Sequence, residues 1–291
     1  MNRSRFQIAK KDIIATFKKS DKILFTSSDI SNILEENQRF WRLPVSLTNQ
    51  RFIEQLIAHT ILKKYRLSFP YRTIIRYSWD DLSAFRFALN LEENSYLTHY
   101  TAMFLHNLTE QIPKTIYVNH EQKEKRIIKA SLIQSNIDRA FMKNARVTSS
   151  IAQFGEHKIC LLNGKFTNRL GVIEMVTPEN EKVMVTDIER TLIDIAVRPS
   201  YSGGIYEVLE AYRRAADKVS VNKLRATLKK LGYIYPHHQV IGFYLEKAGV
   251  YSESQIQLFK KLDMEHDFYL MHKMEDKEYS KEWRLYYPKG F

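Results

Sequence analysis

The 291-residue sequence is 44% hydrophobic and 27% charged, and it contains a single cysteine, Cys160. This composition is typical of a globular protein, and one cysteine excludes both a disulfide framework within the chain and a cysteine-based zinc site. Because no stretch approaches the about 20 apolar residues of a transmembrane helix and the basic N-terminus lacks the apolar core of a signal peptide, we expect a cytoplasmic protein that does not contact membranes.

The formal net charge of +12 is distributed unevenly along the chain. Residues 1–79 contain 15 Lys and Arg against 6 Asp and Glu, whereas the remaining 212 residues contain 30 against 27. Such an asymmetry predicts a module that binds a polyanion, joined to a nearly neutral body. The alternative is a basic surface that serves only solubility.

The first 60 residues predict three helices. An apolar stripe runs through residues 6–19, and a second helix follows the capping side chains of residues 26–29 and ends near residue 37. A third helix is expected from a cap at Ser46 to about residue 60, with Ile53, Leu56 and Ile57 facing the core.

Two short strands are expected next. Residues 62–68 alternate in polarity, Pro70 breaks the pattern, and residues 71–79 are rich in β-branched and aromatic side chains, which predicts a hairpin. The spacing places Arg72, Ile74 and Arg76 on one face of the second strand.

Three helices followed by a basic hairpin is the order of a winged helix-turn-helix, whose third helix enters the major groove of DNA. Arg, Asn and Gln side chains on such a helix can each form two hydrogen bonds to a base, whereas cations on the hairpin contact phosphates. The alternative is a helical domain that packs on the body and binds nothing. The predicted DNA-contacting residues are Thr48, Asn49, Gln50, Arg51 and Gln55 on the helix, and Lys63, Lys64, Arg66, Arg72 and Arg76 on the hairpin.

A linking helix over residues 80–91 and a polar stretch after it suggest a domain boundary between residues 92 and 93. Residues 1–92 would form the DNA-binding domain, and residues 93–291 a larger mixed domain, so the predicted fold class is α+β. In that domain we expect helices at residues 97–108, 205–214, 221–231 and 239–248, strands at 115–118, 146–151, 157–162, 171–176, 268–271 and 283–287, and a turn at 163–165.

The sequence predicts a central helix that begins at residue 186 and ends before Pro199, because proline disfavours the helical conformation of the residue before it. Thr186 and Glu189 have the spacing of a capping box. Ile188, Leu192 and Ile195 share one face. The opposite, polar face is formed by Asp187, Arg190, Thr191 and Asp194, and it is expected to be solvated or joined by an Arg190–Asp194 pair one helical turn apart.

The sequence carries no recognisable catalytic motif. His99 and His106 are two helical turns apart, too far to share one metal ion without other ligands. Glu181-Lys182 with Asp187 is a weak match to the carboxylate–lysine site of a metal-dependent nuclease, which remains an alternative function. We expect no catalytic residue, no metal ion and no cofactor.

Several short segments match one known family in order along the chain. Three of them are Leu97-Thr98-His99-Tyr100-Thr101-Ala102, Leu161-Leu162-Asn163-Gly164-Lys165 and Thr186-Asp187-Ile188-Glu189-Arg190-Thr191-Leu192-Ile193-Asp194. Further matches lie at residues 105–109, 111–118, 171–172, 198–199, 201–204, 242–246 and 283–288. Over nearly its whole length the sequence resembles the AbiEi antitoxins of type IV toxin–antitoxin systems.

This resemblance implies a transcriptional autorepressor. Its winged helix-turn-helix would bind double-stranded DNA at the promoter of its own operon, where inverted repeats are expected. Its C-terminal antitoxin domain would counter a nucleotidyltransferase-like toxin from the same operon, in phage defence. Whether the toxin is contacted directly stays open, as does a toxin-binding module without operator specificity; the candidate contact residues are Arg190, Arg213 and Arg214.

Overall fold

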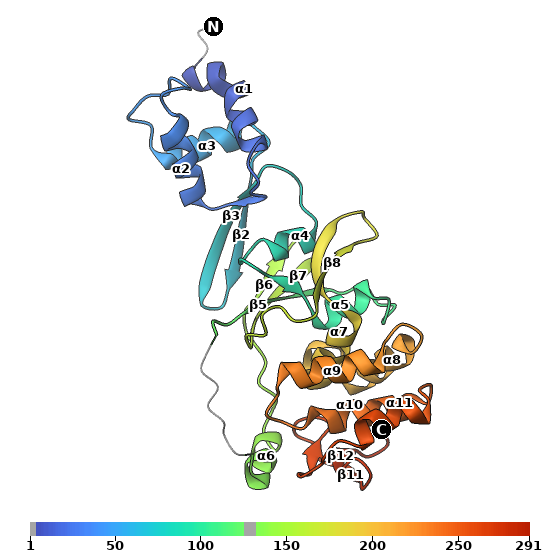
Figure 1. Cartoon of the computed structure of the whole chain (residues 1–291). Helices are drawn as coiled ribbons and strands as arrows, with labels where there is room; N and C mark the ends of the chain where they lie inside the picture. The colour runs from blue at the N-terminus through green and yellow to red at the C-terminus, as the bar shows by residue number, and fades with distance from the viewer. Residues whose placement is uncertain (1–3, 125–131) are drawn as a thin grey trace.

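The computed structural model describes residues 4–124 and 132–291. The chain is α+β, and Figure 1 shows a group of N-terminal helices at one end, a long hairpin that reaches down to a central sheet, and a helical layer with a small sheet at the other end.

The N-terminal helices are α1 (Arg5–Lys18), α2 (Ser27–Asn37) and α3 (Asn49–His59). They enclose a core of their own that includes Phe17 and Phe52. The predicted cap of the third helix was wrong, because the hydroxyl of Thr48, not that of Ser46, accepts the free amide of Arg51. Ile57 is likewise 39% exposed and does not face the core.

The predicted hairpin is confirmed. Strands β2 (Lys63–Phe69) and β3 (Arg72–Ser78) pair antiparallel with Leu67 opposite Ile74. The short strand β1 (Leu24–Phe25) lies between α1 and α2 and pairs with β3. The segment that joins these helices therefore belongs to the same sheet as the hairpin, with the order β1-β3-β2.

The central sheet has six strands in the order β6-β7-β5-β4-β9-β8. The pairs β5–β7 and β4–β9 are parallel, and the other neighbours are antiparallel. The strands are β4 (Tyr96–Leu97), β5 (Thr115–Glu121), β6 (Ile151–Phe154), β7 (His157–Gly164), β8 (Val172–Val176) and β9 (Lys182–Thr186).

Two expectations for this sheet are corrected. Residues 146–150 carry no strand assignment, and the strand begins at Ile151. The turn expected at residues 163–165 starts later, because β7 remains paired with β5 as far as Gly164, whose amide also donates to the Asn119 side chain.

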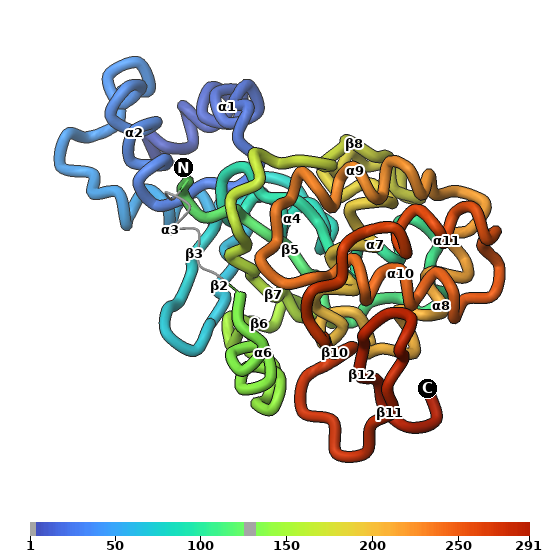
Figure 2. The backbone as a smooth tube through the Cα atoms, turned by 60° about the horizontal axis from the view of Figure 1, so that its bottom comes forward, coloured from blue at the N-terminus to red at the C-terminus, as the bar shows by residue number. Residues whose placement is uncertain are grey.

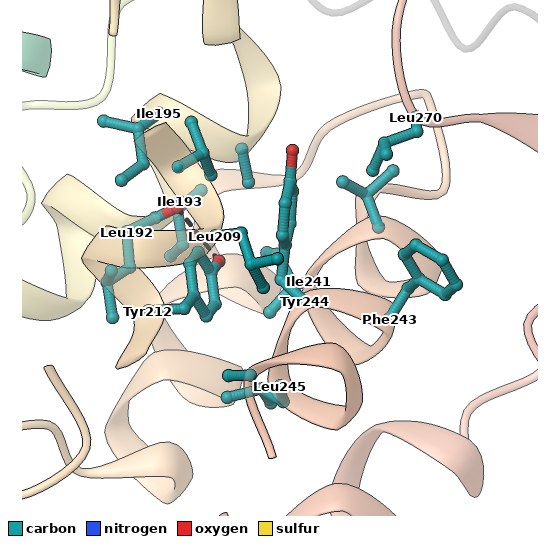
Figure 3. Packing of buried hydrophobic residues seen from close by; sticks show 14 of the residues in the cluster. Leu192, Ile193, Ile195, Leu209, Tyr212, Ile241, Phe243, Tyr244, Leu245 and Leu270 are labelled. Atoms are coloured by element: carbon teal, nitrogen blue, oxygen red, sulfur yellow. Dashed lines mark hydrogen bonds between the residues drawn. The ribbon is translucent and has the colours of Figure 1, made fainter. Parts of the chain in front are cut away.

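The helical layer surrounds α7 (Ile188–Val197), which follows β9 directly. Figure 3 shows Leu192, Ile193 and Ile195 of α7 packed among large apolar side chains of neighbouring helices. The Tyr212 hydroxyl donates to the Leu192 carbonyl at 3.1 Å. The other helices are α4 (Ala84–Leu89), α5 (His99–Leu105), α6 (Gln134–Phe141), η1 (Pro199–Tyr201), α8 (Ile205–Ala215), α9 (Val221–Leu231), α10 (His237–Ala248) and α11 (Glu253–Lys260).

The C-terminal segment closes the structure with a small sheet of order β10-β12-β11. Its strands are β10 (Phe268–Tyr269), β11 (Lys277–Ser280) and β12 (Leu285–Pro288). Trp283, just before β12, is fully buried against α10.

A third apolar core joins the hairpin to the body. Leu67, Phe69 and Ile74 of the hairpin pack in one cluster with Phe87 of α4 and Ile159 of β7. Figure 2 shows the backbone from another side, with β2 next to β6. The division between residues 92 and 93 therefore stays a prediction, since this core includes residues from both sides of it. Within the described residues, no helix combines the length and apolar character needed to cross a membrane.

Candidate functional site

Helix α3 presents its first turn to solvent. Phe52, Ile53 and Leu56 are buried against α1 and α2, which leaves Gln50 and Arg51 on the exposed side. The Gln50 side chain donates to Glu54 one turn on, at 3.1 Å. The Arg51 side chain has no ion-pair partner among residues 4–124 and 132–291.

Three other predicted residues of α3 have structural contacts. Thr48 caps the helix. The Asn49 amide donates to the carbonyl and hydroxyl oxygens of Ser27, at 2.9 and 3.1 Å, and so ties α3 to α2. Gln55 is half-buried, and its side-chain oxygen has no partner in the described part of the chain. Gln50 and Arg51 are therefore the residues of this set with exposed side chains that neither cap α3 nor join it to α2.

The hairpin has two unlike faces. Arg72 and Arg76 share a face with Ile74, as the spacing of the sequence predicted, and this face packs on the body, which was not predicted. Arg72 pairs with Glu92 at 2.6 Å, and Arg76 donates to the Leu91 carbonyl at 3.1 Å. Both cations therefore fasten the hairpin to the body rather than point away from it.

The opposite face of the hairpin carries Lys64 and Arg66. Both are exposed, and neither forms an ion pair with a described residue. Lys63, by contrast, pairs with Asp81. Of the five predicted phosphate contacts, Lys64 and Arg66 are thus the ones free to meet a polyanion.

The polar face of α7 is buried, so the expectation of a solvated face was wrong, whereas the expected pair of Arg190 and Asp194 is confirmed. Arg190 is 5% exposed and Asp194 is 6% exposed. The Arg190 Nε donates to Asp194 at 2.8 Å, and its Nη1 donates to the Leu170 carbonyl at 2.8 Å. Burial alone would lower the pKa of Arg190, but the charge of Asp194 outweighs it and raises that pKa. Arg190 cannot serve as a surface contact for a partner.

The capping box expected at the start of α7 was also wrong. β9 runs through Thr186, so the helix begins one residue later and Asp187 is its cap, accepting the Arg190 amide at 2.8 Å. Glu189 instead accepts the Ser220 amide at 3.0 Å and the Lys223 ammonium at 2.8 Å.

Two further cations lie on α8. Arg213 pairs with Glu210, and Arg214 pairs with Glu110 at 3.0 Å. Each arginine side chain is 41% exposed, so both remain accessible to a partner.

The residues of the nuclease alternative have other partners. Glu181 accepts a hydrogen bond from Ser83, and Asp187 pairs with Lys223 at 3.0 Å besides capping α7. His106 contacts the Thr186 carbonyl through Nε2 at 2.6 Å, whereas His99 lies beside Thr98. No group of three or more His, Cys, Asp or Glu side chains that could hold a metal ion occurs in the described residues.

A pocket of 390 Å³ lies over the end of α7 and was missed from the sequence. Several of the matching segments named above meet there, including Thr98, Gly164 and Asp194. The Thr98 hydroxyl donates to Asp194 at 3.1 Å rather than capping α5. Because a carboxylate only accepts, this bond uses the Thr98 proton, and the His99 Nδ1 at 3.1 Å must donate to Thr98. In the sequence these residues were marked only as members of separate matching segments, and nothing in it indicated that the segments meet.

No protein-family model matches this sequence, and no curated protein matches it. Among solved structures, the fold is similar to the crystal structure of the RV2827C protein from Mycobacterium tuberculosis, with a TM-score of 0.57 and 12% sequence identity over 96% of this chain and 90% of that chain. At this identity the likeness shows a shared fold alone. The resemblance to the AbiEi antitoxins stays a prediction.

Proposed function

We propose that the N-terminal helices and the hairpin act as a winged helix-turn-helix that binds double-stranded DNA, and that the protein represses its own operon. The observation that carries this proposal is the exposed first turn of α3, where Arg51 has no ion-pair partner among the described residues and Gln50 lies beside it. Both side chains have the hydrogen-bonding groups that recognise base edges.

The charge distribution supports the same proposal. Lys64 and Arg66 are exposed on the hairpin, which follows α3 after a short connection. Cations at these positions would contact phosphates and set the affinity, whereas the first turn of α3 would set the sequence preference.

Fluorescence anisotropy with DNA from upstream of the gene tests this proposal. Arg51→Ala should cost about 1–3 kcal/mol of specific binding and leave binding to unrelated DNA nearly unchanged. Lys64→Ala and Arg66→Ala should each weaken binding to every sequence and reduce the slope of log affinity against log salt by about 1. Arg72→Ala, whose cation pairs with Glu92, is the matched control and should leave that slope unchanged. Equal binding of the Arg51 variant to operator and unrelated DNA at the wild-type level would refute base reading by α3.

We further propose that the body counters a nucleotidyltransferase-like toxin encoded beside it, as the resemblance implies. Arg213 and Arg214 are the accessible members of the predicted contact set. Co-expression with the adjacent reading frame tests direct contact: a complex that co-purifies with the wild type but not with Arg213→Ala, Arg214→Ala supports it. Neutralised toxicity without any complex would show that the antitoxin acts indirectly.

A further inference from the structure

The 390 Å³ pocket of the body is bordered by cations from separate parts of the chain. Arg146 precedes β6, Lys165 follows β7, and Arg198 follows α7. All three are exposed, so they stand at the mouth of the pocket. The buried pair of Arg190 and Asp194 lines it as well.

The charge inside the pocket is strongly unbalanced. Asp194 is the only carboxylate among the described residues that line it, and its charge is matched by Arg190 at 2.8 Å. Arg146, Lys165 and Arg198 therefore add positive charge that nothing in the lining offsets. A hollow with walls of low dielectric constant concentrates the field of such charges and attracts an anion.

Two of these cations are held in place by backbone groups. The Lys165 ammonium donates to the carbonyls of Leu231 and Gly232, at 2.9 Å each, which leaves one of its three N–H groups. The Arg198 Nη1 donates to the Arg146 carbonyl at 3.1 Å and so joins two sides of the mouth. Carbonyl partners restrict these side chains without neutralising their charge.

Neutral polar groups line the same pocket. The Asn119 amide donates to the Tyr96 hydroxyl at 2.7 Å, and its oxygen accepts the Gly164 amide at 2.8 Å. Burial lowers the pKa of His99 to about 4, so its ring is neutral near pH 7. The inner part of the pocket is thus polar and uncharged apart from the Arg190–Asp194 pair, which suits the esterified end of a small polar molecule.

We propose that this pocket binds a small molecule carrying a phosphate group, with the phosphate held by Arg146, Lys165 and Arg198. A phosphate monoester is a dianion with three free oxygens, and an arginine fork together with an ammonium group matches both its charge and its geometry. The volume lies within the range of small-molecule sites, about 300–1,000 Å³. This site belongs to the body and is separate from the DNA contacts proposed for α3 and the hairpin.

Isothermal titration calorimetry of the full chain tests the proposal, with inorganic phosphate and adenosine monophosphate as probes in a chloride buffer of constant ionic strength. Saturable binding is expected. Lys165→Gln and Arg198→Gln should each weaken it at least tenfold, because each removes a charge from the mouth of the pocket. Lys158→Gln, an exposed cation near the other end of β7, is the matched control and should leave binding unchanged.

Each outcome decides the proposal. Tighter binding of adenosine monophosphate points to a phosphate ester, and equal binding points to free phosphate; both support the site. Absence of binding at millimolar concentration would overturn it, as would an equal loss in the Lys158 variant. Because Lys165 and Arg198 also hydrogen-bond to backbone carbonyls, a thermal melt without ligand checks that each variant is fully folded at the temperature of the titration. The Arg51→Ala variant should bind phosphate as the wild type does. The phosphate titration therefore tests this site even if the protein fails to bind DNA.

Discussion

The Arg190 guanidinium is buried, its charge is matched by Asp194 on the same helix, and neutral groups from other parts of the chain accept further hydrogen bonds from it. Asp194 lies one turn away on α7, Leu170 contributes a carbonyl at 2.8 Å, and Thr167 contributes a hydroxyl at 3.3 Å. Asp194 also accepts from Thr98, which directly precedes α5. Removing one partner of a buried ion pair destabilises a protein more than replacing both with apolar residues, because the remaining charge keeps its full desolvation cost.

Asp194→Ala should therefore lower the free energy of unfolding by about 3–5 kcal/mol, because Arg190 would stay buried without its counter-ion. Urea denaturation measures this change. The double variant Arg190→Met, Asp194→Leu should regain most of the loss, since it removes both charges. A double variant as unstable as the single one would contradict this account and show that the pair contributes through packing.

Buried histidines give the protein a pH-dependent stability. Burial lowers the pKa of His237 to about 3, below the value near 6.5 of an unfolded chain. Between these values the unfolded state binds more protons, so the free energy of unfolding is fully present above about pH 6.5 and falls as the pH falls below it. His237 packs against Tyr233 and Phe268, and its Nδ1 has no partner in the described part of the chain.

His237→Phe should keep these ring contacts and remove the titration. Between pH 7 and pH 4.5 the variant should lose about 2.5 kcal/mol less stability than the wild type, because about 1.4 kcal/mol per unit of pH acts over the roughly two units below pH 6.5. Denaturation curves at both pH values give the two differences. Carboxylates titrate equally in the two proteins and cancel. An identical loss in both proteins would mean that the pKa of His237 is the same in the folded and the unfolded state.

At the scale of elements, α10 shows a glycine used for close packing. Gly242 is buried within the helix, and a methyl group added there would overlap the Trp283 ring. Trp283 is fully buried, and its indole N–H donates to Glu246 of the same helix at 2.8 Å. Trp283 thereby contributes to holding the C-terminal sheet against α10, together with the ring contact of Phe243 and Tyr287.

Gly242→Ala should destabilise the protein by about 1–2 kcal/mol, although alanine favours helix formation by about 1 kcal/mol, because overpacking outweighs the propensity gain. Thermal unfolding measures the effect. Trp283→Phe frees space, so the double variant should be more stable than the sum of the single changes predicts. Additive losses would show that Trp283 is not the group displaced.

Local patterns predicted most of these elements, whereas the partners of their polar side chains depended on distant residues. The spacing around Ile188 correctly gave α7 and its apolar face. It could not show that Arg190 is buried, since Thr98, Thr167 and Leu170 come from elsewhere in the chain. Two adjacent residues could each have capped α7, and only the length of β9 selects Asp187 over Thr186.

The candidate DNA contacts illustrate the same limit. The pattern of β3 correctly placed Arg72 and Arg76 on the face of Ile74. An apolar residue among cations was a sign that this face packs on something, but nothing local named Glu92 as the partner. The pocket was beyond reach, because its lining comes from residues 96–233 and no single stretch holds more than a few of its side chains.

At the scale of the whole molecule, the three large apolar cores follow one another along its length (Figure 1). The middle core joins the N-terminal helices and hairpin to the body. One core holds the N-terminal helices, another holds the helical layer, and between them lie hairpin residues packed on the central sheet. In this middle core Phe154 of β6 stacks on Phe87 at 4.1 Å and lies 5.7 Å from Tyr65 of the hairpin. The hairpin is thus part of the packing of the body as well as the predicted wing.

This contact also has a consequence for solubility. β6 is an outer strand of the six-stranded sheet, and β2 lies beside it. Unpaired strand edges recruit other chains, and a covering element prevents such self-association. A body shortened to residues 93–291 would present this edge together with an uncovered Phe154, so light scattering should reveal aggregates at concentrations where the full chain stays dispersed. The hairpin would then protect the protein from aggregation even when no DNA is bound.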